Sequence, residues 1–113
     1  MSDRGDVAFL ADIREAIRRI DKYVDGLNYD AFLADTKTQD AVVRNLEIIG
    51  EAVKNVSEEL RWNYPAVPWK ELAGLRDKLI HHYFGVNFDI VWNIITEELP
   101  DIYEQLDDIF PES

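Results

Sequence analysis

The fold class can be predicted first from residues 36–60, TKTQDAVVRNLEIIGEAVKNVSEEL, because they have the pattern of one long helix. Thr36 followed three residues later by Gln39 is the pattern of a capping box, which starts a helix. Apolar residues then recur at intervals of four, three, four, three and four, at Val42, Leu46, Ile49, Val53, Val56 and Leu60. This stripe is typical of a long helix that packs lengthwise against others in a bundle.

Gly50 lies in the middle of that helix. Glycine costs a helix interior about 1 kcal/mol relative to alanine. The residue therefore indicates that another stretch of backbone passes close to the helix at this point.

Helical patterns continue on both sides of residues 36–60. Before them, we expect a first helix that Asp6 caps and Gly26 ends, followed by a single helical turn within 28–34. After them, Pro65 and Pro68 indicate a loop over 61–69, because proline prevents the preceding helix from continuing. A short helix through Leu72, Leu75 and Leu79 comes next, and then a final helix that Asn87 caps and Pro100 kinks or restarts. No strand-like alternation with hairpin turns is found. We expect an all-α, up-and-down bundle of four main helices plus one short helix, with residues 1–113 as a single domain.

The final helix is apolar over a wide arc, which includes Ile90, Val91, Trp92, Ile94, Ile95 and Leu99. One partner helix cannot cover such an arc. A surplus of apolar surface on the last two helices therefore suggests the interface of a homodimer.

Composition limits the classes of function. The chain has 113 residues, no cysteine and a net charge of −11, and it has no apolar run long enough to span a membrane. These features predict a soluble, cytoplasmic protein and argue against a general nucleic-acid binder, whose surface would be basic. Seven of the twelve basic residues nevertheless fall between 37 and 78, so a local basic site on an acidic protein stays open.

Two further clusters allow two interpretations each. The arginines of the first helix, with Lys22, are either a solvated face or a binding patch, and the former is the more common. The aromatic residues Trp62, Tyr64 and Trp69 either stack on nucleobases or pack the loop onto the bundle. Packing is the more frequent role for such residues.

The segment Arg76-Asp77-Lys78-Leu79-Ile80-His81-His82-Tyr83-Phe84-Gly85-Val86-Asn87 holds the candidate chemistry, because an arginine and both histidines of the chain come together there. We expect it to form the last two turns of a short helix, with Gly85 just past the end. Histidine titrates near neutral pH, and an arginine fork matches a phosphate. The alternative is structural: the histidines bind the last helix carbonyls, and Arg76 pairs with Asp77 or Glu71.

Metal sites, phosphate loops and Ser or Cys nucleophiles are not indicated, and no metal or cofactor is expected. The chemistry that these residues favour is metal-independent acid–base cleavage of RNA, whose 2′-OH is an internal nucleophile. On a regular helix, however, Arg76 and His81 point roughly 140° apart at about 100° per residue. Either the last turn unwinds before Gly85, or a second chain completes the pair across a two-fold axis. We favour the second arrangement.

Several blocks of sequence then resemble one known family. They are Arg76-x4-His81-x-Tyr83, Gly85-Val86-Asn87, Asp89-Ile90-Val91-Trp92, Asp35-x-Lys37-Thr38-Gln39-Asp40-Ala41-Val42, Ile48-Ile49-Gly50-Glu51-Ala52 and Tyr64-Pro65-x-x-Pro68-Trp69. In this order and spacing they look like the HepT family of toxins, within the HEPN superfamily. The resemblance covers nearly the whole chain and is weakest in the first helix and the tail.

The resemblance implies an all-helical homodimer that acts as an endoribonuclease toxin of a type VII-like toxin–antitoxin pair, whose antitoxin is a nucleotidyltransferase called MntA. By this likeness Arg76 and His81 are catalytic, and Tyr83 is the tyrosine to which the antitoxin attaches AMP. Lys78, His82 and Asp77 are candidate substrate contacts, and Asp77 stands where many relatives carry Asn.

Two other functions stay open. One is a catalytically idle HEPN subunit that docks the nucleotidyltransferase and helps it hold a nucleotide, which the acidic charge favours. The other is a dimeric scaffold.

Overall fold

The computed structural model describes residues 3–81 and 85–109 of the chain. The elements are α1 (Asp3–Val24), α2 (Tyr29–Leu33), α3 (Thr36–Lys54), α4 (Glu58–Asn63), α5 (Trp69–Ala73), α6 (Leu75–Leu79), β1 (Ile80–His81), β2 (Gly85–Val86), α7 (Phe88–Asn93), the π-helical turn η1 (Ile94–Glu98) and α8 (Leu99–Ile109). The all-α class is confirmed, apart from one hairpin with two residues in each strand. The helices divide more finely than predicted, since α4, α5 and α6 are separate short helices.

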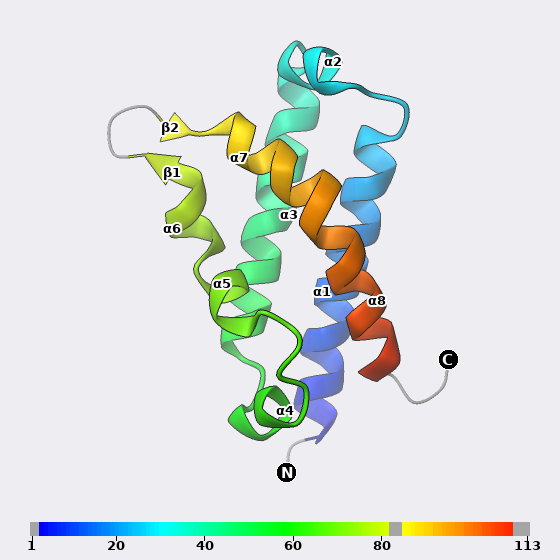
Figure 1. The fold of residues 1–113 in the computed structure, drawn as a ribbon, viewed down its shortest axis with the longest axis vertical. Coiled ribbons are helices and arrows are strands. Elements are labelled where there is room, and N and C mark those ends of the chain that lie inside the picture. The colour runs from blue at the N-terminus through cyan, green and yellow to red at the C-terminus, as the bar shows by residue number, and fades with distance from the viewer. Residues whose placement is uncertain (1–2, 82–84, 110–113) are drawn as a thin grey trace.

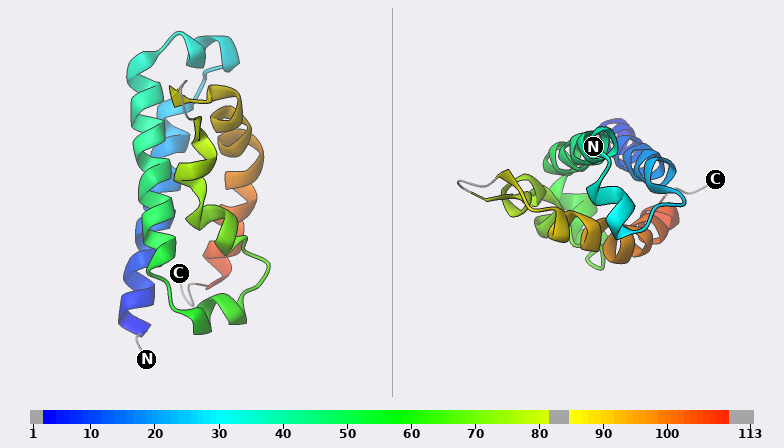
Figure 2. Two further views of the ribbon diagram at one scale, coloured as in Figure 1. Left: turned by 90° about the vertical axis from the view of Figure 1, so that its left-hand side faces the viewer. Right: turned by 90° about the horizontal axis from the view of Figure 1, so that it is seen from above.

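Two layers of helices enclose the core (Figures 1 and 2). The long helices α1 and α3 lie side by side and form one layer, and the second layer contains α5, α6 and the continuous run from α7 to α8 (Figure 2). The largest fully buried side chains come from both layers and from α2: Ile13, Ile17, Ile20, Phe32, Leu46, Ile49, Leu79, Ile94, Leu99 and Leu106. Their burial supplies the main stabilisation of the bundle.

The predicted stripe on α3 is confirmed, but both ends of the helix differ from the prediction. Asp35, not Thr36, is the N-cap residue, and its carboxylate accepts a hydrogen bond from the Thr38 N–H at 3.0 Å. Gln39 does not complete a capping box. Its buried amide instead donates to the carbonyls of Phe32 and Leu33, at 3.0 and 2.8 Å, and so holds α2 against α3.

At the other end, α3 stops at Lys54 instead of continuing to Leu60. Ser57 starts α4, because its hydroxyl accepts from the Leu60 N–H at 3.1 Å. Asp6, predicted to cap the first helix, lies inside α1 and binds both the backbone N–H and the hydroxyl of Ser57, at 2.8 and 2.7 Å. A cap and a contact across 51 residues together break the helix where the apolar pattern alone would continue it.

The close approach predicted at Gly50 is confirmed. A Cβ atom built there would lie 3.2 Å from the Leu72 carbonyl oxygen and 3.8 Å from the Leu75 Cβ. The absence of a side chain thus lets α5 and α6 pack directly on the backbone of α3.

The final helix begins as predicted, since the Asn87 side chain accepts from the Ile90 N–H at 3.1 Å. Of the two effects predicted for Pro100, a kink or a restart, the restart does not occur, because the helical run continues through this residue. Proline cannot donate a backbone hydrogen bond, and the helix adapts through the π-helical turn η1, in which the Leu99 N–H bonds the Ile94 carbonyl.

Within residues 88–109, the apolar surplus expected on this helix is not found. The large apolar residues of this part are buried or half-buried within one chain, because the run from α7 to α8 packs against the other helices of the bundle (Figure 1). The exposed large apolar residues of the described part lie elsewhere, at Val7, Tyr23, Leu33, Trp62 and Tyr64. The last two helices therefore give no support for a dimer interface. No helix in the described ranges has both the length and the apolar character of a membrane span.

Candidate functional site

The predicted helix over the candidate segment ends earlier than expected. Helix α6 stops at Leu79, and β1 pairs antiparallel with β2, so that Ile80 faces Val86 and His81 faces Gly85 in the register. The Asn87 N–H bonds the Leu79 carbonyl at 2.9 Å, which satisfies an acceptor left by the helix end. Gly85 has a φ of +75°, a conformation that other residues rarely adopt. The prediction that the histidines end a helix is therefore wrong for His81, whose backbone belongs to a strand.

This hairpin removes the geometric difficulty between Arg76 and His81. The two residues no longer share a regular helix, so the separation of roughly 140° expected on one does not apply. The first of the two arrangements, in which the last turn unwinds, is the one that the backbone adopts. The His81 side chain, His82 and Tyr83 lie outside the part of the chain that the structure describes, so their predicted roles stay predictions.

Arg76 lines a hollow of about 390 Å³ between α3 and the α5–α6 segment. The other residues that line it are Arg44, Glu47, Ile48, Gly50, Glu51, Lys54 and Ala73. We call this hollow the α3 hollow. Gly50 lines the hollow and allows α5 and α6 to pack closely on α3. Arg76 follows directly after Leu75, which lies against Gly50.

The Arg76 guanidinium is exposed and makes no hydrogen bond or ion pair with any other described residue. The structural alternative, in which Arg76 pairs with Asp77 or Glu71, is therefore not what the chain adopts. A permanent positive charge that lines a concave surface and has no ion-pair partner among residues 3–81 and 85–109 is available for a phosphate.

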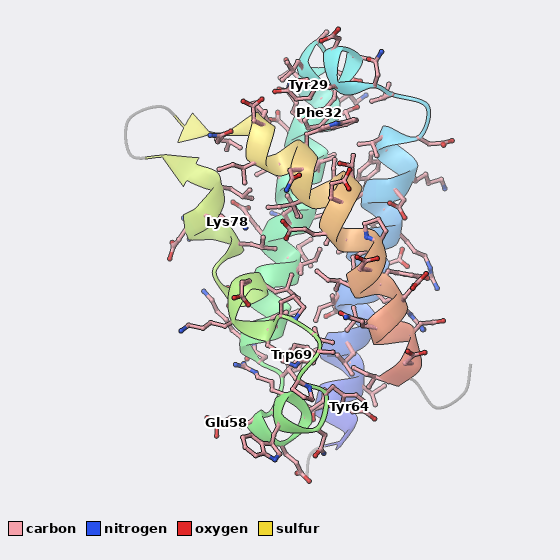
Figure 3. All side chains as sticks on the ribbon, viewed as in Figure 1. Tyr29, Phe32, Glu58, Tyr64, Trp69 and Lys78 are labelled. Atoms are coloured by element: carbon pink, nitrogen blue, oxygen red, sulfur yellow. The ribbon has the colours of Figure 1, made fainter. Side chains whose placement is uncertain are left out.

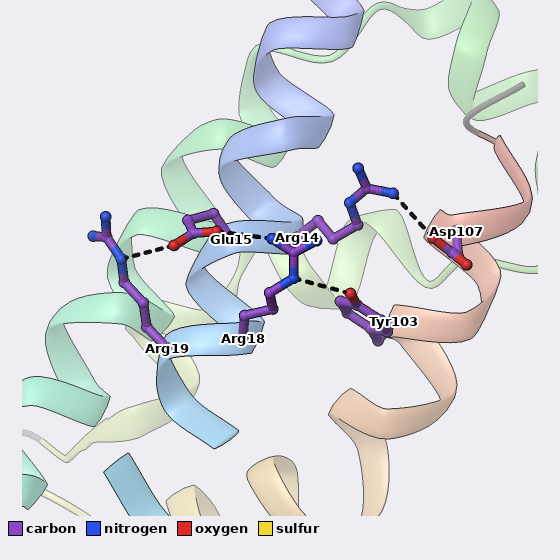
Figure 4. Close-up of polar contacts among 6 residues, drawn as sticks. All are labelled: Arg14, Glu15, Arg18, Arg19, Tyr103 and Asp107. Atoms are coloured by element: carbon purple, nitrogen blue, oxygen red, sulfur yellow. Dashed lines mark hydrogen bonds and ion pairs between the residues drawn. The ribbon is translucent and has the colours of Figure 1, made fainter. Parts of the chain in front are cut away.

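The arginines of α1 behave differently (Figure 4). Arg14 pairs with Asp107 at 3.0 Å, and Arg18 and Arg19 both bind Glu15, at 3.1 and 3.3 Å. Arg18 also donates to the Tyr103 hydroxyl, and this hydrogen bond raises the pKa of Arg18. Acidic and hydroxyl groups thus bind Arg14, Arg18 and Arg19 within the chain, in agreement with a structural rather than a binding role for these three arginines.

Lys78 and Asp77 are exposed on α6, and neither is among the residues that line the α3 hollow (Figure 3 labels Lys78). The structure therefore places these two candidate substrate contacts beside Arg76 in the chain but outside the hollow that Arg76 lines.

The aromatic residues of the predicted loop differ in burial. Trp69 is buried, and its indole N–H donates to the Tyr64 carbonyl at 2.9 Å, so packing is confirmed for this residue (Figure 3). Trp62 is 84% exposed and belongs to α4, which lies at the end of the bundle opposite α2 (Figure 1).

The charged residues of α3 were not singled out as site residues from the sequence. Their spacing indicates that they share one face of the helix, since Arg44, Glu47, Glu51 and Lys54 recur at intervals of three, four and three residues. Only the packing of α5 and α6 turns that face into one side of a hollow.

Comparisons with known proteins agree on one family. Residues 13–109 match the family model described as "Ribonuclease HepT-like". A Methanocaldococcus jannaschii protein, named as a candidate RNase, is 50% identical over 102 residues, which cover 90% of this chain and 84% of that protein. A Thermococcus cleftensis protein, named "Probable ribonuclease HepT", is 46% identical over 94 residues, which cover 83% of this chain and 86% of that protein.

A third relative, from Caldanaerobacter subterraneus subsp. tengcongensis and also named as a candidate RNase, is 51% identical over 86 residues, or 76% of this chain and 77% of its own length. Among solved structures there is no significant match.

Proposed function

Because the chain belongs to the HepT-like ribonuclease family, we propose that it is a metal-independent endoribonuclease that cleaves RNA with Arg76 and His81. Arg76 binds the scissile phosphate and stabilises the negative charge that grows on it. His81 transfers protons. The observation that supports this proposal most is that Arg76 lines the α3 hollow and forms no ion pair with another described residue.

The reaction needs no group that the chain lacks. An imidazole takes the proton of the 2′-OH, and the resulting oxygen attacks the adjacent phosphorus. The bond from phosphorus to the 5′-oxygen breaks, and that oxygen receives a proton. The products are a 2′,3′-cyclic phosphate and a 5′-hydroxyl. A guanidinium about 2.7–3.1 Å from the phosphate oxygens would favour the charged transition state in the manner of an oxyanion hole.

We propose that the working form is a homodimer. Each cleavage event needs one proton acceptor and one proton donor, and a second copy of the chain would bring a second His81 to the same cleft. His82 is the residue that would make one chain sufficient. A mixed dimer in which only one chain keeps His81 distinguishes the two arrangements, because it should lose activity only if both copies of His81 act together.

The same family membership favours a toxin that is paired with a nucleotidyltransferase antitoxin of the MntA type. In this proposal the antitoxin attaches AMP to Tyr83, two residues after His81 in the sequence. A phosphate ester adds negative charge and bulk where the RNA phosphate would bind, so it would block the site. A cytoplasmic RNA substrate also suits a chain without cysteine.

One observation favours a second function, a catalytically idle subunit that binds the nucleotidyltransferase and a nucleotide. Glu47 and Glu51 line the same hollow as Arg76, in a chain with a net charge of −11. Two carboxylates weaken the attraction of the hollow for a long polyanion. A single nucleotide, held by Arg76 through its phosphate, would be less affected.

Incubation of the purified protein with total RNA in EDTA separates the two functions. We expect the parent to cut RNA, and Arg76→Ala and His81→Ala to cut it at least about a hundredfold more slowly. Arg19→Ala is the matched control, because it removes an exposed arginine that binds Glu15 outside the α3 hollow. Intact RNA with every variant over a wide concentration range would support the idle subunit.

Expression in cells tests the toxin pair. The parent should stop growth when it is expressed alone and not when the neighbouring nucleotidyltransferase is expressed with it. If Tyr83→Phe is toxic with and without that partner, Tyr83 is the site of neutralisation. If the partner still rescues Tyr83→Phe, the proposed modification is wrong while the ribonuclease proposal stands.

A further inference from the structure

A charged stripe on α3 faces Arg76 across the α3 hollow. It consists of Arg44, Glu47, Glu51 and Lys54, and all four residues line the hollow. At about 1.5 Å per residue, the stripe from Arg44 to Lys54 extends roughly 15 Å along the helix axis. Read along the helix, the signs are plus, minus, minus and plus.

These charges have no ion-pair partner in the part of the chain that the structure describes. Neither Arg76 nor any of the four stripe residues forms an ion pair with another described residue. By contrast, three ion pairs form within α1 or between α1 and α8. The hollow therefore carries three positive and two negative side chains, a net charge of +1, on a chain whose net charge is −11. It is a local exception to the field of the whole protein, which otherwise repels polyanions.

We infer that the α3 hollow is the track of the RNA strand, in which Arg44 and Lys54 bind the phosphates on either side of the one that Arg76 holds. This inference rests on the proposed function and deepens it. An arginine and a lysine at the two ends of a stripe can neutralise phosphates that follow one another along a single strand. Neither residue touches the reacting atoms, so both are binding residues and not catalytic ones.

The two carboxylates have a separate consequence. Glu47 and Glu51 lie between the cations along the helix, where they would repel a phosphate and accept hydrogen bonds from hydroxyl or amino groups. A strand avoids this repulsion if its two outer phosphates lie at the ends of the stripe, while its middle phosphate turns toward Arg76 and its sugar or base donors turn toward the carboxylates. The stripe thus selects strand position and lowers total affinity.

A second copy of the chain fits this stripe less well. The order plus, minus, minus, plus is the same from either end. An antiparallel copy related by a two-fold axis through the middle of the stripe would therefore set Arg44 against Lys54 of the other copy and Glu47 against Glu51 of the other copy. Like charges in contact are unfavourable. The observations favour an anionic strand, and the proposed dimer would use another face.

Binding to labelled single-stranded RNA tests the inference. The measurement is fluorescence anisotropy over a range of roughly 50 to 200 mM KCl in the His81→Ala chain, which cannot cleave the probe under the proposed mechanism. We expect Arg44→Ala and Lys54→Ala each to weaken binding by roughly threefold or more, and to reduce the slope of log Kd against log salt by about 0.7 for each phosphate that is no longer bound. Glu51→Gln should strengthen binding, because it removes a repulsive charge and keeps a polar side chain.

Lys22→Ala is the matched control, because Lys22 is an exposed lysine on α1 outside the hollow. Arg44→Lys is a second control, because it keeps the positive charge and should therefore keep most of the affinity for RNA. It shows whether the loss of binding by Arg44→Ala comes from the lost charge and not from a folding defect. The inference is overturned if Arg44→Ala and Lys54→Ala bind the RNA as tightly as Lys22→Ala does. It is also overturned if they leave RNA binding unchanged and instead alter the oligomeric state in sedimentation, because a second copy would then cover the stripe.

Cleavage by the chain with His81 intact is scored separately. If the RNA is bound as expected but never cut, the inference of an RNA track is supported and the ribonuclease proposal is wrong. If the parent, Arg44→Ala and Lys54→Ala cut RNA equally well at limiting concentration, the inference of an RNA track is wrong and the ribonuclease proposal stands.

Discussion

Replacement of Gly50 by alanine tests whether the close packing of α5 on α3 builds the site. Two opposing effects set the result. Alanine is more favourable than glycine in a helix interior by about 1 kcal/mol. The new Cβ would lie 3.2 Å from the Leu72 carbonyl oxygen, however, which is closer than such atoms normally approach.

The carbonyl has little freedom to retreat. Leu72 and Trp69 are buried on the same short helix, and the backbone of α5 is held by hydrogen bonds, among them Leu72 N–H to the Pro68 carbonyl at 3.0 Å. Overpacking of this kind costs about 1–3 kcal/mol. The net expectation for Gly50→Ala is therefore a decrease of up to about 2 kcal/mol in the free energy of unfolding, or several degrees in Tm at about 4 °C per kcal/mol.

Gly5→Ala is the matched control. Gly5 is also in a helix, and a Cβ there would meet nothing within 4 Å. Urea unfolding of the parent and both variants should show Gly5→Ala equal to or more stable than the parent, and Gly50→Ala less stable than Gly5→Ala by about 1–3 kcal/mol. Equal stabilisation by the two substitutions would contradict this expectation, because it would show that no backbone closely approaches Gly50.

Further predictions concern the aromatic loop and the helix cap. Trp69→Ala should lower the free energy of unfolding by about 3–5 kcal/mol in urea titrations, since it empties a buried site, whereas Trp62→Ala should change it by less than about 0.5 kcal/mol. A comparable decrease at both positions would contradict the assigned burial. Hydrogen bonds from the side chain and backbone of Thr38 lower the pKa of Asp35 in the folded chain. Asp35 therefore stabilises the fold above the carboxyl pKa of the unfolded chain, about 3.9, and this stabilisation is lost as the pH falls through the lower folded value. Urea unfolding from about pH 6 down to about pH 2 should accordingly show a smaller acid-induced decrease in stability for Asp35→Asn than for the parent, and identical pH profiles would exclude this role of the carboxylate.

Local signals in the sequence were sufficient for most helices. The stripe from Val42 to Val53 predicted α3, Gly26 ended the first helix region with a φ of +81°, and Asn87 capped the last helix. The free-energy cost of a glycine inside a helix correctly indicated that another stretch of backbone approaches α3 at Gly50. In each case one residue or one periodicity determines the local structure, so no distant contact is needed to predict it.

Features set by distant contacts could not be predicted in the same way. The apolar pattern runs through Val56 to Leu60 without a break, but Asp6 binds Ser57 and a new helix starts there. The apolar arc of the last helix was assigned to a partner chain because the course of α7 to α8 over the bundle was unknown.

The candidate site shows the same division. Residue types and spacing identified Arg76, but not that helix α6 ends at Leu79, since two strands of two residues each carry no alternation that a pattern can detect. Arg44 and Lys54 were visible only as basic residues. Their place opposite Arg76 depends on the packing of α5 and α6, which no spacing within α3 reports.

The proposed ribonuclease depends on Arg76 and His81 cleaving RNA through its own 2′-OH. A decisive experiment uses one RNA whose cleavage position has been mapped, beside the same strand with a single 2′-deoxy sugar at that position, both in EDTA. We expect cleavage of the first strand to a 2′,3′-cyclic phosphate and a 5′-hydroxyl, and no cleavage of the second strand at the altered position. Equal cleavage of both strands, or loss of all cleavage by the parent in EDTA, would contradict this mechanism.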